Sequence, residues 1–473
     1  MADRQRGWQI AIALALALLW LALALPHIAT RYSYDWDSSQ YERGVAQFDI
    51  ARHQPQPPGY PLWILALKIL TPLVGRVNAA QVILAMLFTI AGLIAFFALA
   101  RDTLGPRAAF AATAMLAFSP VVMLYAITPE TYSVDLFATC TIAWCAARLW
   151  RGETRWASLA FALAAITAGF RQSGATFLLL LLFVAAWRAR RVTIGLITGA
   201  TCALAWYIPT AQLTGGFTTL AVLDRTQLMT VLRTTSVFFG APVSVHVHML
   251  LDACLFFALA LIPAALVLVP RRRPVAPSPA RPLFFLLWLG PNLAFITLFH
   301  CGRPGYILLS LPPLILLAAW LASPLPDRPH WTLAIAALGL AAGYFPYERF
   351  INPAVPTAVY QLLKASPRMP GLLESSQRQI RTLIDNLPGH PEEKLVFCLL
   401  ERTEAPNLRT MTYEYPDVQW ADGDDLRVPP PARTIAWLCD GAGLPPTIRA
   451  RYTQAQRVAG NALFSLWTAA AQP

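Results

Sequence analysis

The chain has few charged residues for its length. Only 13% of its 473 residues are Asp, Glu, Lys or Arg, whereas 56% are hydrophobic, and the mean hydropathy is +0.50. A composition this apolar excludes a set of soluble domains and is typical of a chain that crosses a membrane many times. The sequence therefore predicts a polytopic α-helical membrane protein.

Patterns that carry soluble-enzyme chemistry are also missing. The chain has no glycine-rich phosphate loop, zinc motif or nucleophile elbow, which disfavours chemistry on soluble nucleotides. Most of its seven cysteines lie in apolar runs, where a thiol usually packs as a small hydrophobe. Cys398 and Cys439 lie in the polar C-terminal region, where a disulfide and two free thiols are both open interpretations.

The net charge of +12 does not indicate a nucleic-acid partner. Residues 347–473 hold 13 basic and 13 acidic residues, so the whole excess lies in the apolar part of the chain. Basic residues beside apolar spans set the orientation of the spans and contact anionic headgroups. The charge therefore predicts membrane lipids as partners, and no nucleic acid.

The alternation of apolar segments and basic loops predicts eleven spans, with the N-terminus in the cytoplasm and the C-terminus outside. Residues 8–25 are longer than the apolar core of a signal peptide, which favours an uncleaved anchor. Residues 156–187 are interpreted as two short spans that meet at Arg171, because a single span would put the following arginine cluster outside. The other predicted spans are residues 77–100, 107–127, 134–150, 194–208, 248–269, 282–299, 306–321 and 331–345.

Two further stretches are predicted to lie at the membrane surface. Residues 61–74 contain Lys68 and are too short to cross the bilayer, so an interfacial or re-entrant helix is expected. The second long outer loop, residues 209–245, contains two amphipathic pieces near Leu220 and Val231.

These segments divide the chain into two predicted domains. Residues 1–346 form a transmembrane domain whose first external loop is residues 27–76, and residues 347–473 form a small α/β extracytoplasmic domain. The second part has a helical pattern within residues 355–386 and strand-like runs at residues 395–400, 434–439 and 462–467. A domain of about 125 residues can bury a core of its own.

Charged residues from separate segments gather at the predicted outer face. Ordinary loop polarity is the alternative interpretation for any one of them. Glu130, Arg171 and Arg303 interrupt apolar segments, however, where an ionised group costs about 2.5–3.5 kcal/mol at mid-bilayer and usually faces a cavity. The whole set is Asp35, Asp37, Glu42, Arg52, His53, Glu130, Arg171, His300 and Arg303.

Acids opposed by arginines fit transfer from a phosphate-linked donor. A carboxylate can accept the proton of an acceptor hydroxyl, while guanidinium groups hold the leaving phosphate through paired hydrogen bonds. The candidate catalytic acids are Asp37, Asp35, Glu42 and Glu130. The candidate residues for the donor phosphate are Arg171, Arg303, Arg52 and His53. We expect no cofactor, although His53, His246, His248 and His300 leave a divalent metal site open as an alternative.

The first external loop resembles that of the GT-C membrane glycosyltransferases. Asp-Ser-Ser-Gln-Tyr at residues 37–41 is followed by His-x-Pro-x-Pro-Pro-Gly-Tyr-Pro-Leu at residues 53–62, and the nearest likeness is to the branch related to protein O-mannosyltransferases. Thr-Pro-Glu-Thr-Tyr-Ser at residues 128–133 is similar to an outer turn of that branch. Gly-Arg-Pro-Gly-Tyr at residues 302–306, followed by Leu-Pro-Pro at residues 311–313, is similar to the start of its late helix.

The resemblance implies a polyprenyl-phosphate-linked sugar donor, inversion at the anomeric carbon, and an extracytoplasmic glycan, lipid or protein acceptor. It selects Asp37 as the base. Gln40 stands where the family has Glu, which leaves a second acidic role to Glu42 or Glu130. Gln54 and Gln56 interrupt the His-Pro-Pro string and leave the substrates open. The implied loop-shaping residues are Pro57, Pro58, Gly59 and Tyr60.

Other classes of protein stay open at this point. A transporter or lipid-linked-sugar flippase would line a pathway with the same charges, although transporters more often show inverted repeats and polar residues at mid-membrane. A non-catalytic membrane assembly protein with an external recognition domain is a third interpretation. The gathering of charges at one face favours an enzyme. The compact size and the lack of eukaryotic retention signals favour a bacterial inner membrane.

Overall fold

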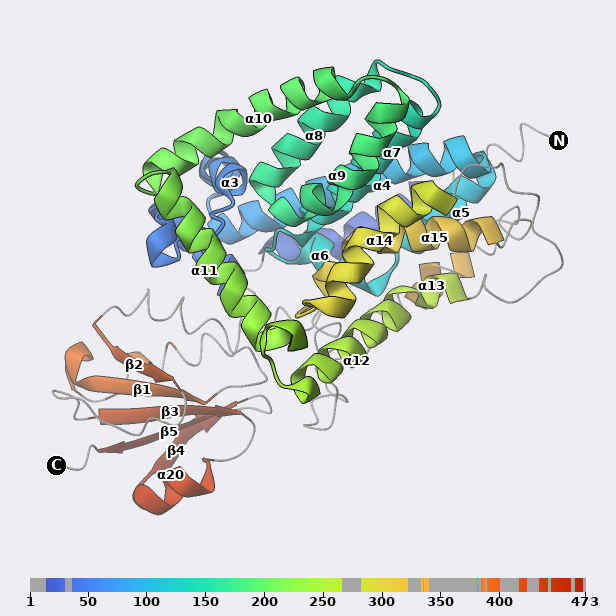
Figure 1. Cartoon of the computed structure of the whole chain (residues 1–473). Helices are drawn as coiled ribbons and strands as arrows, with labels where there is room; N and C mark the ends of the chain where they lie inside the picture. Colours follow the sequence, from blue (N-terminus) through green and yellow to red (C-terminus); the bar gives the residue numbers. More distant parts are fainter. Residues whose placement is uncertain are drawn as a thin grey trace.

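The fold consists of a helical part followed by a small β-sheet (Figure 1). It is seen in a computed structural model, which describes residues 14–29, 36–265, 282–321, 333–334, 336–339, 381, 384–385, 387, 389–399, 417–422, 434–440, 444–460 and 464–470. The predicted class, a polytopic helical membrane protein with a small α/β part at its C-terminal end, is confirmed.

The first half of the helical part carries the first external loop and the longest helix. Residues 14–24 are helical and run into the 3-10 helix η1 (Leu25–Ala29). The following elements are α2 (Trp36–Ala46), η2 (Ile50–Arg52), α3 (Pro61–Val74), α4 (Val77–Leu104), α5 (Pro106–Ala117) and α6 (Pro120–Ile127).

The second half contains the helices α7 to α15. They are α7 (Tyr132–Trp150), α8 (Trp156–Phe170), α9 (Gln172–Arg188), α10 (Val192–Leu213), α11 (Phe217–Thr235), η3 (Val237–Phe239), α12 (Val243–Ala260), α13 (Ile262–Ala265), α14 (Pro282–Leu298), η4 (Pro304–Leu309) and α15 (Leu311–Leu321).

Among the described helices, α4, α10 and α12 are long and apolar enough to cross a membrane by themselves. The predicted span at residues 107–127 is instead a bent pair, α5 and α6, whose axes differ by 59°. Pro120 begins α6, and a proline at the first helical position ends the hydrogen-bonding ladder of what precedes it. The total of eleven spans stays a prediction.

The ambiguous segment at residues 156–187 is two helices, as predicted. Arg171 is extended, with φ −158° and ψ 121°, and it ends α8 and precedes α9. The break therefore presents the arginine and the first turn of α9 at one end of the bundle, beside the start of α7.

The outer loop at residues 209–245 differs from the prediction. α10 runs through Pro209 to Leu213, and α11 is one continuous helix that contains both Leu220 and Val231. No glycine or proline lies between Phe217 and Thr235, so nothing in the sequence breaks this helix. The two predicted pieces are therefore halves of a single element.

The short helix α3 has two apolar faces. Trp63, Ile64 and Leu67 are buried against the bundle, whereas Ile69 and Leu73 are 65% and 78% exposed. An exposed apolar face of this kind fits the predicted helix at the membrane surface. Its place relative to a bilayer stays a prediction.

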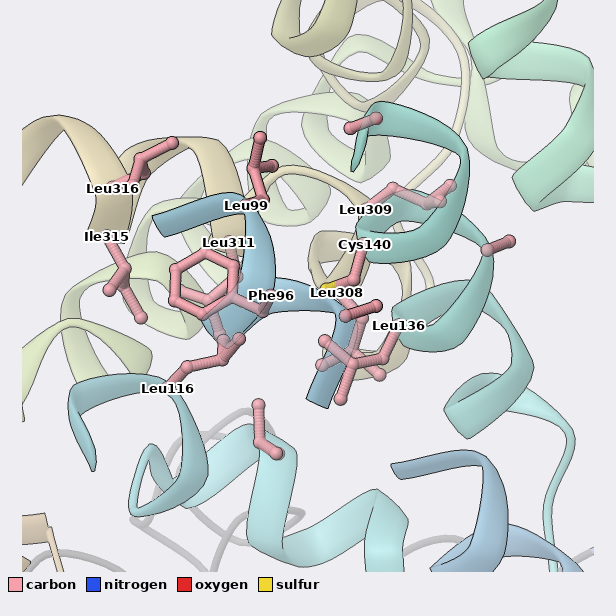
Figure 2. Close-up of a cluster of buried hydrophobic side chains, with 14 of the residues drawn as sticks. Phe96, Leu99, Leu116, Leu136, Cys140, Leu308, Leu309, Leu311, Ile315 and Leu316 are labelled. Atoms are coloured by element: carbon pink, nitrogen blue, oxygen red, sulfur yellow. The ribbon is translucent and has the colours of Figure 1, made fainter. Parts of the chain in front are cut away.

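A core of large apolar side chains joins α4, α5 and α7 to the late elements η4 and α15 (Figure 2). α4 and α7 lie close together, because a Cβ atom at Gly92 would come within 3.1 Å of the Phe137 Cα atom. α7 also lies beside η4, because Thr139 Oγ1 donates to the Leu309 carbonyl oxygen over 3.0 Å. The labelled core residues are Phe96, Leu99, Leu116, Leu136, Cys140, Leu308, Leu309, Leu311, Ile315 and Leu316.

The C-terminal sheet has five strands in the order β2-β1-β3-β5-β4. β1 (Lys394–Leu399) is parallel to β2 (Gln419–Asp422) and β3 (Thr434–Asp440), whereas β5 (Phe464–Ala470) is antiparallel to β3 and β4 (Gln456–Gly460). The short elements η7 (Pro391–Glu393) and α20 (Pro446–Arg451) precede β1 and β4. The three predicted strands correspond to β1, β3 and β5, and most of the predicted helix at residues 355–386 lies outside the described residues.

Candidate functional site

The centre of the charged cluster is a buried ion pair between α7 and the break that precedes α9. Arg171 Nε donates to Asp135 Oδ2 over 2.6 Å, and Arg171 Nη1 donates to Thr131 Oγ1 over 2.8 Å. The guanidinium carbon lies 3.8 Å from the centroid of the Tyr132 ring. The side chains of Arg171 and Asp135 are only 7% and 2% exposed, so each charge is compensated by its partner rather than by water.

The Asp135 carboxylate also occupies the N-terminus of α9. Ser173 Oγ lies 2.9 and 3.0 Å from its two oxygens, and the backbone N–H of Gly174 donates to it. The first turn of a helix favours an anion, because its N–H groups have no partner within the helix. Gly174 allows this approach, since a Cβ atom there would lie 2.9 Å from Asp135 Oδ1.

Asp135 was not among the residues predicted for the site. It lies within the predicted span at residues 134–150, and an acidic residue in an apolar run indicates a buried partner or a functional site. That signal was present in the sequence. Its partner, Arg171, is 36 residues further along the chain.

A second ion pair lies beside the first. Arg303 Nη1 lies 3.4 Å from Glu130 Oε1, and the Glu130 side chain is 1% exposed whereas that of Arg303 is 26% exposed. Gly305 lies so close to the Tyr132 ring that any Cβ atom there would overlap it. The loop at residues 300–304 is therefore held against the turn at residues 128–131.

Aromatic rings join both ion pairs to the first external loop. Tyr132 contacts Tyr306 with ring centroids 5.7 Å apart, and Tyr41 contacts Tyr60 at 5.2 Å. The Tyr41 hydroxyl lies 3.3 Å from Thr131 Oγ1, the same oxygen that accepts from Arg171. α2 is thereby anchored on the outer turn.

Asp37 lies at this junction. It precedes Tyr41 by four residues on α2, so the two side chains share one face of the helix. Burial raises the pKa of the Tyr60 phenol above its usual range; the charge of Arg171 opposes this rise, and the charge of Asp37 adds to it. Asp37 is thus one helical turn from Tyr41, whose hydroxyl contacts the same Thr131 oxygen as Arg171.

The cluster has a buried layer and an accessible layer. Tyr41, Glu130, Tyr132 and Arg171 are buried. The half-buried layer is formed by Asp37, Tyr60, Arg303 and Tyr306. A carboxylate, a guanidinium and two phenols thus form the side of the cluster that a ligand can reach.

The structure places Arg52 and His53 in a local turn. Arg52 Nε lies 3.4 Å from Asp49 Oδ2, and the Arg52 side chain is 72% exposed. His53 ends η2 in the left-handed conformation, with φ 56°. Arg52 therefore has a partner within its own loop, unlike Arg171 and Arg303, whose partners come from distant segments.

Of the two remaining candidate acids, the structure describes only Glu42. Glu42 follows Asp37 by five residues on α2, a rotation of about 140° around the helix axis, so it does not share the face of Asp37. Asp35 lies outside the described residues. Of the four predicted acids, the structure thus brings Asp37 and Glu130 together.

The proline-rich turn is tied to α2 by a buried hydrogen bond. The backbone N–H of Gln56 donates to Gln40 Oε1 over 3.1 Å. Gly59 and Tyr60 have φ values of 91° and 45°, and Pro61 begins α3. Pro57 is buried and Pro58 half-buried. Gln40 acts here as an acceptor for a backbone group, and an amide fills that role without a buried charge.

The histidines make hydrogen bonds rather than a shared cluster. His300 Nδ1 lies 3.1 Å from Thr235 Oγ1, and His246 Nδ1 lies 3.2 Å from the Thr235 carbonyl oxygen. His248 Nδ1 lies 2.7 Å from the Ser244 carbonyl oxygen. Within the described part of the chain, no three His, Cys, Asp or Glu side chains gather as metal ligands.

Comparison with known proteins shows what the chain is similar to. Residues 55–213 match the family described as dolichyl-phosphate-mannose-protein mannosyltransferase. The crystal structure of ArnT from Cupriavidus metallidurans bound to undecaprenyl phosphate is similar over 98% of both chains, with a TM-score of 0.58 and 15% identity. The chain therefore has the fold of a GT-C membrane glycosyltransferase, and about a third of it matches a mannosyltransferase family.

Two further comparisons define the extent of the likeness. ArnT in the apo state matches this chain with a TM-score of 0.53 and 14% identity, again over 98% of both chains. No curated protein sequence matches it. The family match contains Glu130, Asp135 and Arg171 of this chain, whereas Asp37 and Arg303 lie outside it.

Proposed function

We propose that this membrane glycosyltransferase moves a sugar from a polyprenyl-phosphate-linked donor to a hydroxyl group of an extracytoplasmic acceptor, with inversion at the anomeric carbon. The observation that carries the proposal is a contact network that links four separate segments. Glu130 pairs with Arg303, and Thr131 contacts both Arg171 and Tyr41. Asp37 lies one helical turn before Tyr41 on α2. The undecaprenyl phosphate in the ArnT structure supports a donor of this chemical class.

In the proposed reaction, Asp37 is the general base. Its carboxylate takes the proton of the acceptor hydroxyl while the acceptor oxygen forms a bond to the anomeric carbon. The bond from that carbon to the phosphate oxygen breaks, and its electron pair leaves with polyprenyl phosphate. Asp37 lies in the first turn of α2, where the helix dipole favours the ionised carboxylate that this step requires.

Arg303 is the proposed contact of the donor phosphate. Its guanidinium is more accessible than that of Arg171, and guanidinium donors suit the paired oxygens of a phosphate. Glu130 holds Arg303 from the buried side. Arg171 adds positive charge from the buried layer of the cluster, where its Nε and Nη1 atoms already have hydrogen-bond partners.

The site requires a membrane on one side and an acceptor on the other. The chain is an integral membrane protein, and we assign it to a bacterial inner membrane with its N-terminus in the cytoplasm. We assign residues 1–346 to the catalytic domain and residues 347–473 to an extracytoplasmic domain. The acceptor is a glycan, a lipid or a protein.

The decisive experiment is a transfer assay with the purified full chain, polyprenyl-phosphate sugars and candidate acceptors. Asp37→Asn removes the base and keeps the side-chain shape, so we expect transfer to fall at least about 100-fold. Asp49→Asn is the matched control, because Asp49 is an acid of the same loop that pairs with exposed Arg52.

Retained transfer by Asp37→Asn would contradict the assignment of the base. If the wild-type chain transfers no sugar but moves lipid-linked sugars between the leaflets of proteoliposomes, the protein is a flippase and the proposed reaction is wrong.

A further inference from the structure

We infer that Asp135 is a positioning residue. It holds Arg171 in the buried layer of the cluster, so that Arg303 supplies the guanidinium that contacts the donor phosphate. The inference rests on the proposed function, because it assigns a role within that transfer site. It changes the role predicted for Arg171 from a phosphate contact to a residue that acts through its neighbours.

The hydrogen bonds of Arg171 hold its guanidinium against α7 and the turn that precedes it. Nε donates to Asp135 and Nη1 donates to Thr131, while the face of the guanidinium covers the Tyr132 ring. These two donors are therefore engaged within the buried layer of the cluster rather than with a ligand. Asp135 is itself fixed by Ser173 and by the N–H of Gly174, so its carboxylate has one orientation.

The charge of Arg171 nevertheless reaches the accessible layer. The guanidinium carbon of Arg171 lies 6.0 Å from the centroid of the Tyr306 ring, which belongs to that accessible layer. A guanidinium this near to the phosphate position would turn toward the phosphate if its own carboxylate partner were removed, because a buried unpaired charge is strongly destabilising. Asp135 is thus the group that keeps the Arg171 side chain in the buried layer of the cluster.

The same hydrogen bonds connect Glu130 to Asp37, the proposed general base. Thr131 accepts from Arg171, contacts the Tyr41 hydroxyl, and directly follows Glu130 in the chain. Tyr41 lies one helical turn from Asp37. Displacement of Arg171 would therefore move the general base relative to the pair of Glu130 and Arg303, and a misplacement of about 1 Å can lower a rate about 100-fold.

α7 supplies a matched control at its other end. Arg148, in the last turn of α7, lies 2.6 Å from Asp102 Oδ2, and both side chains are largely buried. Like Asp135 and Arg171, this pair joins an aspartate to an arginine and uses a residue of α7. Arg148 also pairs with Glu153, and Asp102 with Arg151. The pair lies among the predicted inner loops, away from Asp37 and Arg303.

The test compares Asp135→Asn with Asp102→Asn in the full-length protein. For each variant we would measure kcat, KM for the polyprenyl-phosphate sugar, thermal stability, and the affinity for polyprenyl phosphate itself. For Asp135→Asn we expect kcat to fall about 100-fold, whereas polyprenyl phosphate binds about tenfold more tightly because Arg171 gains a charge-assisted hydrogen bond to it. For Asp102→Asn we expect lower thermal stability with kcat and affinity within about twofold of the wild type.

A purely structural role would lower stability and lose kcat and phosphate affinity together, and that result would overturn the inference. A kcat of Asp135→Asn within about twofold of the wild type would also overturn it. If the wild-type chain turns over no polyprenyl-phosphate sugar, the proposed function fails instead, so the two failures are distinguishable.

The double variant Asp135→Leu with Arg171→Met covers the case in which Asp135→Asn does not fold. Replacing both charges with apolar side chains restores a compensated interior. We expect this variant to fold, to keep the low kcat, and to bind polyprenyl phosphate no more tightly than the wild type. Recovery of the wild-type kcat would show that the pair only stabilises the fold, and the inference would be wrong.

Discussion

The charged residues of the site differ in how they are held. Arg171 and Asp135 are nearly inaccessible, Glu130 is buried behind Arg303, and Arg303 keeps about a quarter of its side chain exposed. An exposed ion pair contributes little binding or stability, whereas a half-buried cation with a fixed carboxylate partner presents its donors in one direction. Arg303 is therefore the arginine whose removal tests the phosphate contact.

Replacement of Arg303 is predicted to weaken donor binding selectively. Arg303→Ala removes charge-assisted hydrogen bonds that are each worth about 1.5–3 kcal/mol, so we expect KM for the polyprenyl-phosphate sugar to rise at least about tenfold. Arg303→Lys should recover part of the loss, because it keeps the charge without the paired geometry. Steady-state kinetics over a range of donor concentrations would measure both effects.

Arg52→Ala is the control for that prediction. Arg52 is 72% exposed and pairs with Asp49 in its own loop, so we expect KM to stay within about twofold of the wild type. An equal rise in KM for Arg52→Ala and Arg303→Ala would place the phosphate at the first external loop and contradict the assignment to Arg303.

At the scale of the elements, the site is built where helices end. Asp37 lies in the first turn of α2, Asp135 in the first turn of α7, and Arg171 in the break before α9. Helix ends leave backbone groups without partners, and polar side chains gather there even when the helices themselves are apolar. The first turn of α9 lies close to α7 at Gly174.

A side chain at Gly174 is predicted to disturb this contact. A Cβ atom there would lie 2.9 Å from both Asp135 Oδ1 and the Ala138 Cβ atom, and both lie on α7. We expect Gly174→Ala to destabilise the fold by about 1–3 kcal/mol and to reduce transfer, as crowding in a packed interface does. Thermal denaturation in detergent and the transfer assay would measure the two effects.

Gly290→Ala provides the comparison on another helix. The nearest atom to a Cβ atom at Gly290 is Leu286 Cδ1 at 3.6 Å, which is ordinary contact. We expect stability within about 1 kcal/mol of the wild type and unchanged transfer. Equal effects of the two glycine substitutions would show that the close approach at Gly174 has no special role.

Sequence patterns predicted the helices and strands more accurately than the contacts between residues of remote segments. The break at Arg171 followed from the charge of the next loop, and three strands followed from apolar runs. β2 and β4 were missed because the first has four residues and the second reads Gln-Arg-Val-Ala-Gly, with little apolar signal. The role of Asp135 was missed because its partner is remote in sequence, and a sequence pattern carries no distance between remote segments.

At the scale of the whole molecule, the candidate site groups α2, the start of α7, the start of α9 and the loop before η4 at one end of the helical bundle. All four belong to the predicted outer side. The ion pair of Asp102 and Arg148, with Glu153 beside it, lies at the opposite end of α7. α7 therefore runs from one predicted side of the membrane to the other, and its two ends must differ in access.

Labelling of single cysteines is predicted to follow this division. Arg52 and Thr219 are exposed in the predicted outer loops, and Thr154 is exposed in a predicted inner loop. In a chain without its native cysteines, Arg52→Cys and Thr219→Cys should react with a membrane-impermeant maleimide in intact cells, whereas Thr154→Cys should react only after permeabilisation. Labelling of Thr154→Cys in intact cells would reverse the orientation of α7. The proposed site would then face the cytoplasm, and an extracytoplasmic acceptor would be excluded.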